Sequence, residues 1–181
     1  MPEGDSIARL TARLHAETAG RTITSCRLDV PRFATVDLSG RTIEAVVPRG
    51  KHLLHRLSGG LTVHSHLRMA GRWALGSSKA PPRGEPWHQV RARLGLDDGR
   101  TLWGVRLPVL EVLQTRDEHR VVGHLGPDLL DPRWDDGHTA EALARLTAAP
   151  GRPLVEALLD QRNVAGIGNL YAVEGCYLAR R

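Results

Sequence analysis

The first residues of the chain carry the groups best suited to chemistry. Pro2 follows the initiator Met1 and directly precedes Glu3. Removal of Met1 would leave a secondary amine, and an α-amino group titrates at about pH 7.7–8.0, so much of it is an uncharged nucleophile near neutral pH. Such an amine forms an iminium ion with an aldehyde, and the adjacent carboxylate can exchange the proton. These residues alone still favour a simpler interpretation, because Pro followed by acidic residues also suits a helix start.

A second candidate site is a glycine-rich turn near the end of the chain. Gly166 and Gly168 lie between two helical patterns and precede Asn169. Glycines allow close backbone approach, and free amides at a helix N-terminus attract phosphate. A plain helical hairpin, with Asn169 as a helix N-cap, fits these residues equally well. A nucleotide-binding loop is a weaker interpretation, because the turn does not follow a strand or complete G-x-G-x-x-G.

The middle of the chain offers a candidate phosphate ligand and a pair of histidines. Lys51 follows Gly50 between two strand-like segments, and a lysine ammonium is a good point-charge partner for phosphate. A solvated turn lysine is the alternative. His64 and His66 should share one strand face, but no third ligand is apparent, so a metal site is not expected.

Composition indicates a globular protein with a polyanionic partner. The chain has 181 residues, 41% of them hydrophobic, with a net charge of +5 and a pI near 10.0. Nucleic acid is the leading candidate partner. Cys26 and Cys176 form neither a CxxC pair nor a disulfide framework, and no segment resembles a membrane span or a signal peptide. We therefore expect a cytoplasmic protein, associated with the nucleoid through DNA.

Periodicity predicts which elements position these residues. Ile7, Leu10 and Leu14 recur at helical spacing, so one helix is expected over residues 5–18, capped by Asp5 or Ser6. Alternating patterns then predict short strands, and the turn sequences 58–60 and 97–100 predict hairpins between consecutive strands. The predicted strands are 25–30, 42–47, 52–57, 61–67, 90–96 and 101–107. Antiparallel pairing of this kind indicates a sandwich or barrel.

The pattern changes near residue 120. Strand signals disappear there, and the segments 139–148, 153–160 and 169–178 look helical. An exposed loop is expected at 77–86, which is rich in Ser, Pro, Gly and charged residues. We predict a first domain over residues 1–120 and a second over 121–181.

Three motifs in order resemble a known family. They are MPEGDSI at residues 1–7, PRGKHLL at 48–54 and DQRNVAGIGNLYAVE at 160–174. Together they resemble the formamidopyrimidine-DNA glycosylase and endonuclease VIII family, and the MPEG opening leans toward the endonuclease VIII branch. The resemblance implies an α+β fold, with a leading helix, an N-terminal antiparallel β-sandwich and a helix–two-turn–helix domain.

The resemblance also implies roles for individual residues. Pro2 matches the nucleophile that attacks C1′ of the damaged nucleotide, and Glu3 matches the general acid that protonates the sugar ring oxygen. Lys51 and Asn169 match residues that hold the DNA backbone, and Lys51, which contacts phosphate near the lesion, is also expected among the catalytic residues. The segment 64–73 resembles the family's intercalation loop, with Met69, alone or with Arg68 or Leu67, as the wedge that fills the gap left by a flipped base. The alternative is that Leu67 and Met69 are core residues at strand spacing.

The sequence departs from the family in two respects. Cys26 and Cys176 alone cannot form the family's four-cysteine zinc finger, so no zinc site is expected in this chain. Ser6 also stands where many relatives have glutamate, which leaves Asp5 as the nearest carboxylate.

The expected function is a bifunctional DNA glycosylase and abasic-site lyase. It would act as a monomer on damaged double-stranded DNA, excise oxidised bases, with pyrimidines favoured, and need no metal or organic cofactor. Two alternatives are a catalytically weak DNA-binding remnant of the same family and a tautomerase-like enzyme with Pro2 as its base. The latter leaves the Lys51 segment and the glycine turn unexplained.

Overall fold

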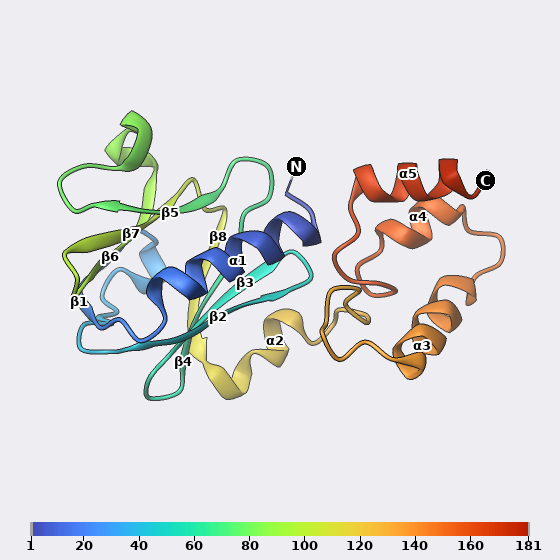
Figure 1. Cartoon of the computed structure of the whole chain (residues 1–181), viewed down its shortest axis with the longest axis horizontal. Helices are drawn as coiled ribbons and strands as arrows, with labels where there is room; N and C mark the ends of the chain where they lie inside the picture. Colours follow the sequence, from blue (N-terminus) through green and yellow to red (C-terminus); the bar gives the residue numbers. More distant parts are fainter. Residues whose placement is uncertain (1, 181) are drawn as a thin grey trace.

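Two antiparallel sheets and a group of helices make up the chain (Figure 1). The structure is a computed structural model that describes residues 2–180. The first part contains α1 (Gly4–Thr18), β1 (Ile23–Leu28), β2 (Ile43–Arg49), β3 (His52–Leu57), β4 (Leu61–His66), β5 (Arg72–Ser77), β6 (Val90–Leu96), β7 (Arg100–Val105) and β8 (Val109–Gln114). The second contains α2 (His119–Val122), α3 (Asp136–Thr147), α4 (Leu154–Leu159) and α5 (Asn169–Leu178).

The strands form the sandwich that the sequence predicted. One sheet has the order β1-β6-β7-β5 and the other β2-β3-β4-β8, and every pairing is antiparallel. Both predicted hairpins are present, β3–β4 at residues 58–60 and β6–β7 at 97–99. A single apolar core contains side chains from both sheets and from α1. The α+β fold class is therefore confirmed.

Helix α1 lies over the sandwich because its apolar side chains face one way. Ile7 and Leu14 are almost completely buried, and each such side chain contributes about 1.5–3 kcal/mol to stability. The helix begins at Gly4, and its N-cap is Glu3. The prediction that Asp5 or Ser6 caps it was wrong, because both residues already lie inside the first turn.

Two strands were not predicted from the sequence, and each has a local reason. Strand β5 runs through the end of the segment assigned to an intercalation loop, and it carries only two core-facing side chains, Trp73 and Leu75. Strand β8 repeats apolar pairs, Val109-Leu110 and Val112-Leu113, where a half-buried strand normally alternates. Both strands lie at the edges of their sheets. Fewer side chains are buried there, so the alternation of apolar and polar residues is weaker.

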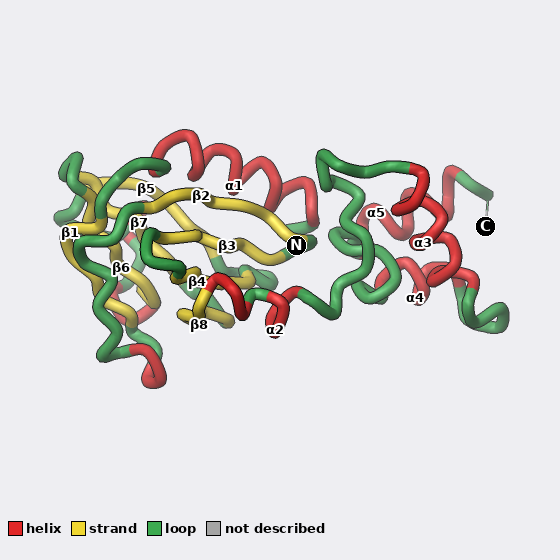
Figure 2. Tube along the Cα trace, turned by 90° about the horizontal axis from the view of Figure 1, so that it is seen from below, coloured by secondary structure: helices red, strands yellow, loops and turns green. Residues whose placement is uncertain are grey.

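The helical part adjoins the sandwich through a small second core. Leu54 of β3 packs with Val122, Leu125 and Ala165, so the outer side of one sheet contacts the segment after residue 120. Figure 2 shows α3, α4 and α5 gathered beyond α2 at one end of the molecule. All three helices predicted for this part are present, with small shifts of their ends, whereas the domain boundary near residue 120 stays a prediction.

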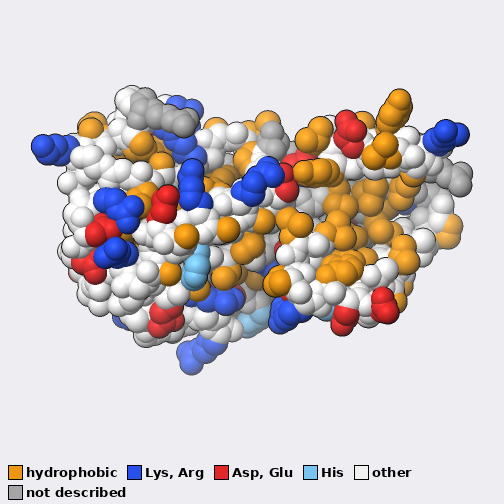
Figure 3. Space-filling view, in the orientation of Figure 1, with side chains coloured by type: hydrophobic (Ala, Val, Ile, Leu, Met, Phe, Trp, Pro, Cys, Tyr) orange, Lys and Arg blue, Asp and Glu red, His pale blue; other side chains and the backbone are white. Residues whose placement is uncertain are grey.

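The helical part exposes much apolar surface. Hydrophobic side chains gather over it in Figure 3, and α5 alone exposes Leu170, Val173, Tyr177 and Leu178. Only Ala172 of α5 is fully buried among the described residues. No described helix combines the length and the apolar character that a membrane span needs.

Candidate functional site

Glu3 joins the start of the chain to the start of α5. Its side chain is buried, with the residue only 4% exposed, and its carboxylate accepts hydrogen bonds from three backbone amides of the glycine-turn helix. The Gly168 and Leu170 amides donate at 2.8 Å each, and the Tyr171 amide at 3.4 Å. A carboxylate at this position satisfies amides that a helix leaves unpaired and complements its positive end. Glu3 therefore caps a helix that lies 165 residues further along the chain.

This contact replaces the N-cap role considered for Asn169. The N-cap of α5 is Gly168, and Asn169 is the first helical residue, exposed to solvent. A Cβ atom at Gly168 would overlap the Glu3 carboxyl group, so glycine is required where the two segments meet. The side chain of Asn169 is consequently left on the surface beside the capped amides.

Gln161 holds the glycine turn in shape. Its side-chain amide donates to the carbonyl oxygens of Leu159 and Ile167 at 3.0 and 2.8 Å, and its oxygen accepts from the Gly166 amide at 3.0 Å. Gly166 has φ +97°, a conformation that favours glycine. The Gly4 amide donates to the Gly166 carbonyl at 2.9 Å, so the turn also contacts the first residue of α1.

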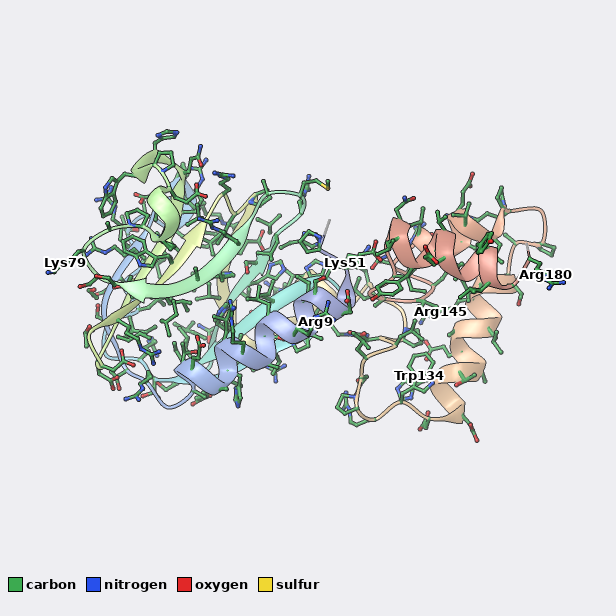
Figure 4. The ribbon with its side chains drawn as sticks, turned by 45° about the horizontal axis from the view of Figure 1, so that its top comes forward. Arg9, Lys51, Lys79, Trp134, Arg145 and Arg180 are labelled. Atoms are coloured by element: carbon green, nitrogen blue, oxygen red, sulfur yellow. The ribbon has the colours of Figure 1, made fainter. Side chains whose placement is uncertain are left out.

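Lys51 lies in the turn between β2 and β3, at the junction of the two parts (Figure 4). Gly50 permits the turn with φ +56°, and its amide donates to the Asp128 carboxylate at 2.6 Å. Partial burial lowers the pKa of Lys51, and the negative charge of Glu3 opposes that shift. The ammonium group and the Glu3 carboxylate are thus close enough to interact electrostatically.

Met69 lies at the tip of a tight turn that leaves β4. It is 71% exposed, whereas Leu67 is buried in the sandwich core, as the alternative interpretation of Leu67 expected. The Gly71 amide donates to the Leu67 carbonyl at 2.8 Å, which closes the turn. Arg68 takes φ +46° and donates its amide to Nδ1 of His66. An unbranched apolar side chain is therefore presented to solvent on a fixed turn.

The histidines near Lys51 pack against one another. Nδ1 of His52 and Nε2 of His64 are 2.8 Å apart, and the His52 ring lies edge-on to His66, with a centroid separation of 4.8 Å. Burial, followed by the nearby imidazoles of His64, His66 and His124, lowers the pKa of His52 to about 3. Within residues 2–180 no three His, Cys, Asp or Glu side chains are arranged to hold a metal ion. His64 and His66 thus belong to a stack of rings.

The structure brings most of the predicted site residues to one junction. Pro2 is half-buried and directly precedes Glu3, which contacts the amides beside Asn169 and interacts with Lys51. Met69 lies three residues after His66. Burial lowers the pKa of His66, and the charges of Arg68, His64 and, last, Lys51 add to that shift. The predicted removal of Met1 lies outside the described residues. The catalytic and DNA-binding roles of these residues stay predictions.

Sequence reasoning missed the residues that support this junction. Asp128 fixes the Gly50 amide, and its second oxygen accepts from the Leu130 amide at 3.0 Å. An isolated aspartate in a loop carries no signal for such a role. Gln161 lies inside the motif at residues 160–174, but its hydrogen bonds within the turn are visible only in three dimensions.

Comparisons with known proteins point to one family. Residues 1–106 match the family described as "Formamidopyrimidine-DNA glycosylase N-terminal domain". The chain is 57% identical over 178 residues to a Streptomyces coelicolor protein named "Probable endonuclease 8 2", a match that covers 98% of this chain and 63% of the relative. It is 45% identical over 181 residues to the Mycolicibacterium smegmatis "DNA-(apurinic or apyrimidinic site) lyase Nei2", covering 100% of this chain and 68% of that protein.

Solved structures share the fold. A complex of the wild-type Lactococcus lactis protein Fpg with DNA that contains an oxidized pyrimidine matches with a TM-score of 0.76 and 25% identity, covering 99% of this chain and 68% of that one. A complex of the same protein with DNA that contains an abasic site has a TM-score of 0.78 at 24% identity, covering 98% and 68%. The chain therefore spans about two thirds of the length of the relatives it matches, 63% in the case of the Streptomyces protein.

Proposed function

The chain belongs to the formamidopyrimidine-DNA glycosylase and endonuclease VIII family, and we propose that it is a DNA repair glycosylase with abasic-site lyase activity. One observation carries the proposal. Glu3, the neighbour of Pro2, is fixed against the start of α5, and its charge acts on Lys51. A nucleophile in this segment, with the Lys51 ammonium and the Asn169 side chain available to phosphates, suits an attack on the sugar of a DNA strand.

The first chemical step replaces the bond to the base. The amine nitrogen of Pro2 bonds to C1′ of the damaged nucleotide and loses its proton, and the bond between C1′ and the base breaks, with the base leaving protonated. Protonation of the ring oxygen then opens the sugar and leaves an iminium ion at C1′. Glu3 is the proposed donor of this proton; three amides occupy most of its roughly four acceptor positions, which leaves about one for exchange.

The second step cleaves the strand. Loss of a proton from C2′ of the iminium ion expels the phosphate on C3′, and water then hydrolyses the iminium to release Pro2. The Pro2 nitrogen, the Glu3 carboxylate and water supply every group that these steps need. We therefore propose that no metal or organic cofactor takes part.

DNA engagement rests on three elements around the nucleophile. The Lys51 ammonium and the exposed Asn169 side chain contact phosphates, and such contacts position the strand without reading its sequence. Met69 inserts into the stack and offsets the few kcal/mol lost when a base flips out. The proposed substrate is damaged double-stranded DNA with an oxidised base, pyrimidines favoured, and the protein acts as a monomer in the cytoplasm, on nucleoid DNA.

Trapping of the covalent intermediate tests the proposal. The protein, with removal of Met1 verified by intact mass, is incubated with a duplex that contains an abasic site and is reduced with borohydride. A stable protein–DNA adduct is expected, because borohydride converts the iminium ion to an amine. Pro2→Gly should lose most of the adduct, and a fraction that retains Met1 should form none, because an amide nitrogen cannot form an iminium ion.

DNA binding measured in the same samples separates an active lyase from a DNA-binding protein with weak catalysis. Salt-dependent DNA binding without any adduct would reject the proposed chemistry and favour a DNA-binding protein with weak catalysis. An adduct that is equal for the parent and Pro2→Gly would move the nucleophile to another amine, with Lys51 the first candidate because burial lowers its pKa.

A further inference from the structure

The outer face of the sheet β1-β6-β7-β5 carries cations around an aromatic centre. Arg27 on β1 lies opposite Arg93 on β6, and Arg93 lies opposite Trp103 on β7. Directly paired residues share one face of a sheet, so these three side chains form a row across three strands. Leu94, the neighbour of Arg93, faces the core instead. The row therefore lies on the side of the sheet that turns away from the sandwich core.

A second tryptophan covers this row and remains accessible. Trp87 belongs to the loop between β5 and β6 and is 55% exposed. Its ring lies edge-on to the fully buried ring of Trp103, with centroids 5.6 Å apart and planes at 72°. The Arg93 guanidinium lies 5.9 Å from the Trp87 centroid and 5.3 Å from that of Trp103, and it donates to the Ser78 carbonyl at 3.1 Å. The Trp87 indole is thus held firmly while much of it faces solvent.

Charge around Trp87 is predominantly positive. Lys79 adjoins Ser78 and is exposed, and Arg27 is 73% exposed as a side chain. The nearest acidic groups are already occupied. Asp29 pairs with Arg27 in an exposed contact that is worth little, and Glu85 is buried between Arg72 and Arg106. The net field at this surface therefore attracts an anion.

We propose that this surface, the Trp87 patch of Arg27, Lys79, Trp87 and Arg93, binds an unpaired stretch of DNA strand. A base stacks on the exposed part of the Trp87 indole, and the cations contact the neighbouring phosphates. Such combinations of an aromatic platform with a basic surface hold single strands without sequence preference. An unpaired strand is the occupant, because the bases of an intact duplex have no free face for the indole.

The Trp87 patch is separate from the candidate active site. Figure 4 shows Lys79 at the far end of the sandwich from Lys51, so one duplex segment seated at Lys51 does not place its damaged base near Trp87. The patch goes beyond the proposed glycosylase function and does not depend on it. An unpaired strand could be held there whether or not Pro2 forms an iminium ion.

Fluorescence anisotropy with two labelled probes tests the proposal. One probe is a short single-stranded oligothymidylate, and the other is a duplex with a stable abasic-site analogue. Trp87→Ala should weaken binding of the single strand by about 5-fold or more, since stacking of one base on an aromatic side chain is worth about 1–3 kcal/mol. Its affinity for the duplex should not change. Trp87→Phe keeps an aromatic face and should retain most of the single-strand affinity.

Matched variants separate this site from the active site. Lys51→Ala should weaken duplex binding while leaving the single strand unaffected, the opposite of Trp87→Ala. Arg27→Gln and Lys79→Gln should each reduce the slope of log affinity against log salt for the single strand by about 0.7. Thermal unfolding equal to that of the parent verifies that each variant is folded. Unchanged single-strand affinity in folded Trp87→Ala, or parallel losses on both probes, would overturn the proposal.

Discussion

Glu3 has two tasks, and they can be separated experimentally. It is proposed to deliver a proton to the sugar, and it caps α5 through three amide hydrogen bonds. Hydrogen bonds to a charged acceptor are worth about 1.5–3 kcal/mol each. Glu3→Gln keeps the shape of the side chain but removes its charge and one acceptor oxygen.

We expect Glu3→Gln to slow the reaction on a damaged base, from base removal to strand cleavage, more than strand cleavage at a preformed abasic site. An abasic sugar also exists as a ring-opened aldehyde, which Pro2 can attack without the proton proposed to come from Glu3. Denaturant unfolding should also show a stability loss on the order of 2 kcal/mol, from the weakened cap. Single-turnover assays on a damaged-base duplex and an abasic duplex measure the first effect. Equal slowing on both substrates would contradict the proposed proton transfer.

The turn between β2 and β3 positions Lys51, and its glycine can be tested against a matched glycine elsewhere. Gly50 has φ +56°, and a Cβ atom there would lie 3.2 Å from Cβ of Ala165. Gly60, in the β3–β4 hairpin, has φ +70°, but a Cβ atom there would meet nothing within 4 Å. The two positions share the backbone strain of a left-handed residue, and only Gly50 contacts the helical part.

Both Gly50→Ala and Gly60→Ala should therefore lose about 1–2 kcal/mol of unfolding free energy from the strained backbone. Only Gly50→Ala should also weaken binding to an abasic-site duplex, because its methyl group displaces the turn that carries Lys51. Denaturant titration and anisotropy measure the two effects. A duplex affinity that Gly60→Ala reduces as much as Gly50→Ala would show that the loss reflects general destabilisation.

At the scale of the whole molecule, the contact between the two sheets predicts a dependence of stability on pH. His55 of β3 is fully buried against Trp73 of β5, and neither of its ring nitrogens has a hydrogen-bond partner among the described residues. Burial lowers the pKa of His55 to about 4. The folded protein thus keeps this imidazole neutral between about pH 4 and pH 6.5, whereas the unfolded chain binds a proton there.

Because the unfolded state binds more protons in this window, stability should fall as pH drops below about 6.5. At about pH 5 the loss from His55 alone is on the order of 2 kcal/mol. His52, with its pKa lowered to about 3, adds to the same trend. His55→Phe removes this titrating group. The decrease in urea midpoint between about pH 7.5 and pH 5 should therefore be smaller in the variant than in the parent. An equally steep change in the variant would assign it to other groups.

Local sequence patterns were sufficient to predict the strongly periodic elements and to identify the family motifs. Helix α1 and six of the eight strands followed from period, and the tight hairpins followed from turn residues. The glycine turn and Lys51 could be singled out because glycine and lysine have specific local meanings. Strands β5 and β8 could not, because a sheet edge buries too few side chains to impose alternation.

The contacts between these elements could be seen only in the fold. The fold placed the Glu3 carboxylate on backbone amides at the start of α5, 165 residues away. It also made Gly168, and not Asn169, the N-cap of that helix. The fold also set Trp87 on Trp103 beside Arg93, just after the segment 77–86 that was predicted only as an exposed loop. The physical reason is the same in each case. The spacing of apolar residues shows which side of a helix or strand is buried. It does not show which segment packs against that side, because that segment is distant in the sequence and is selected by packing in the fold.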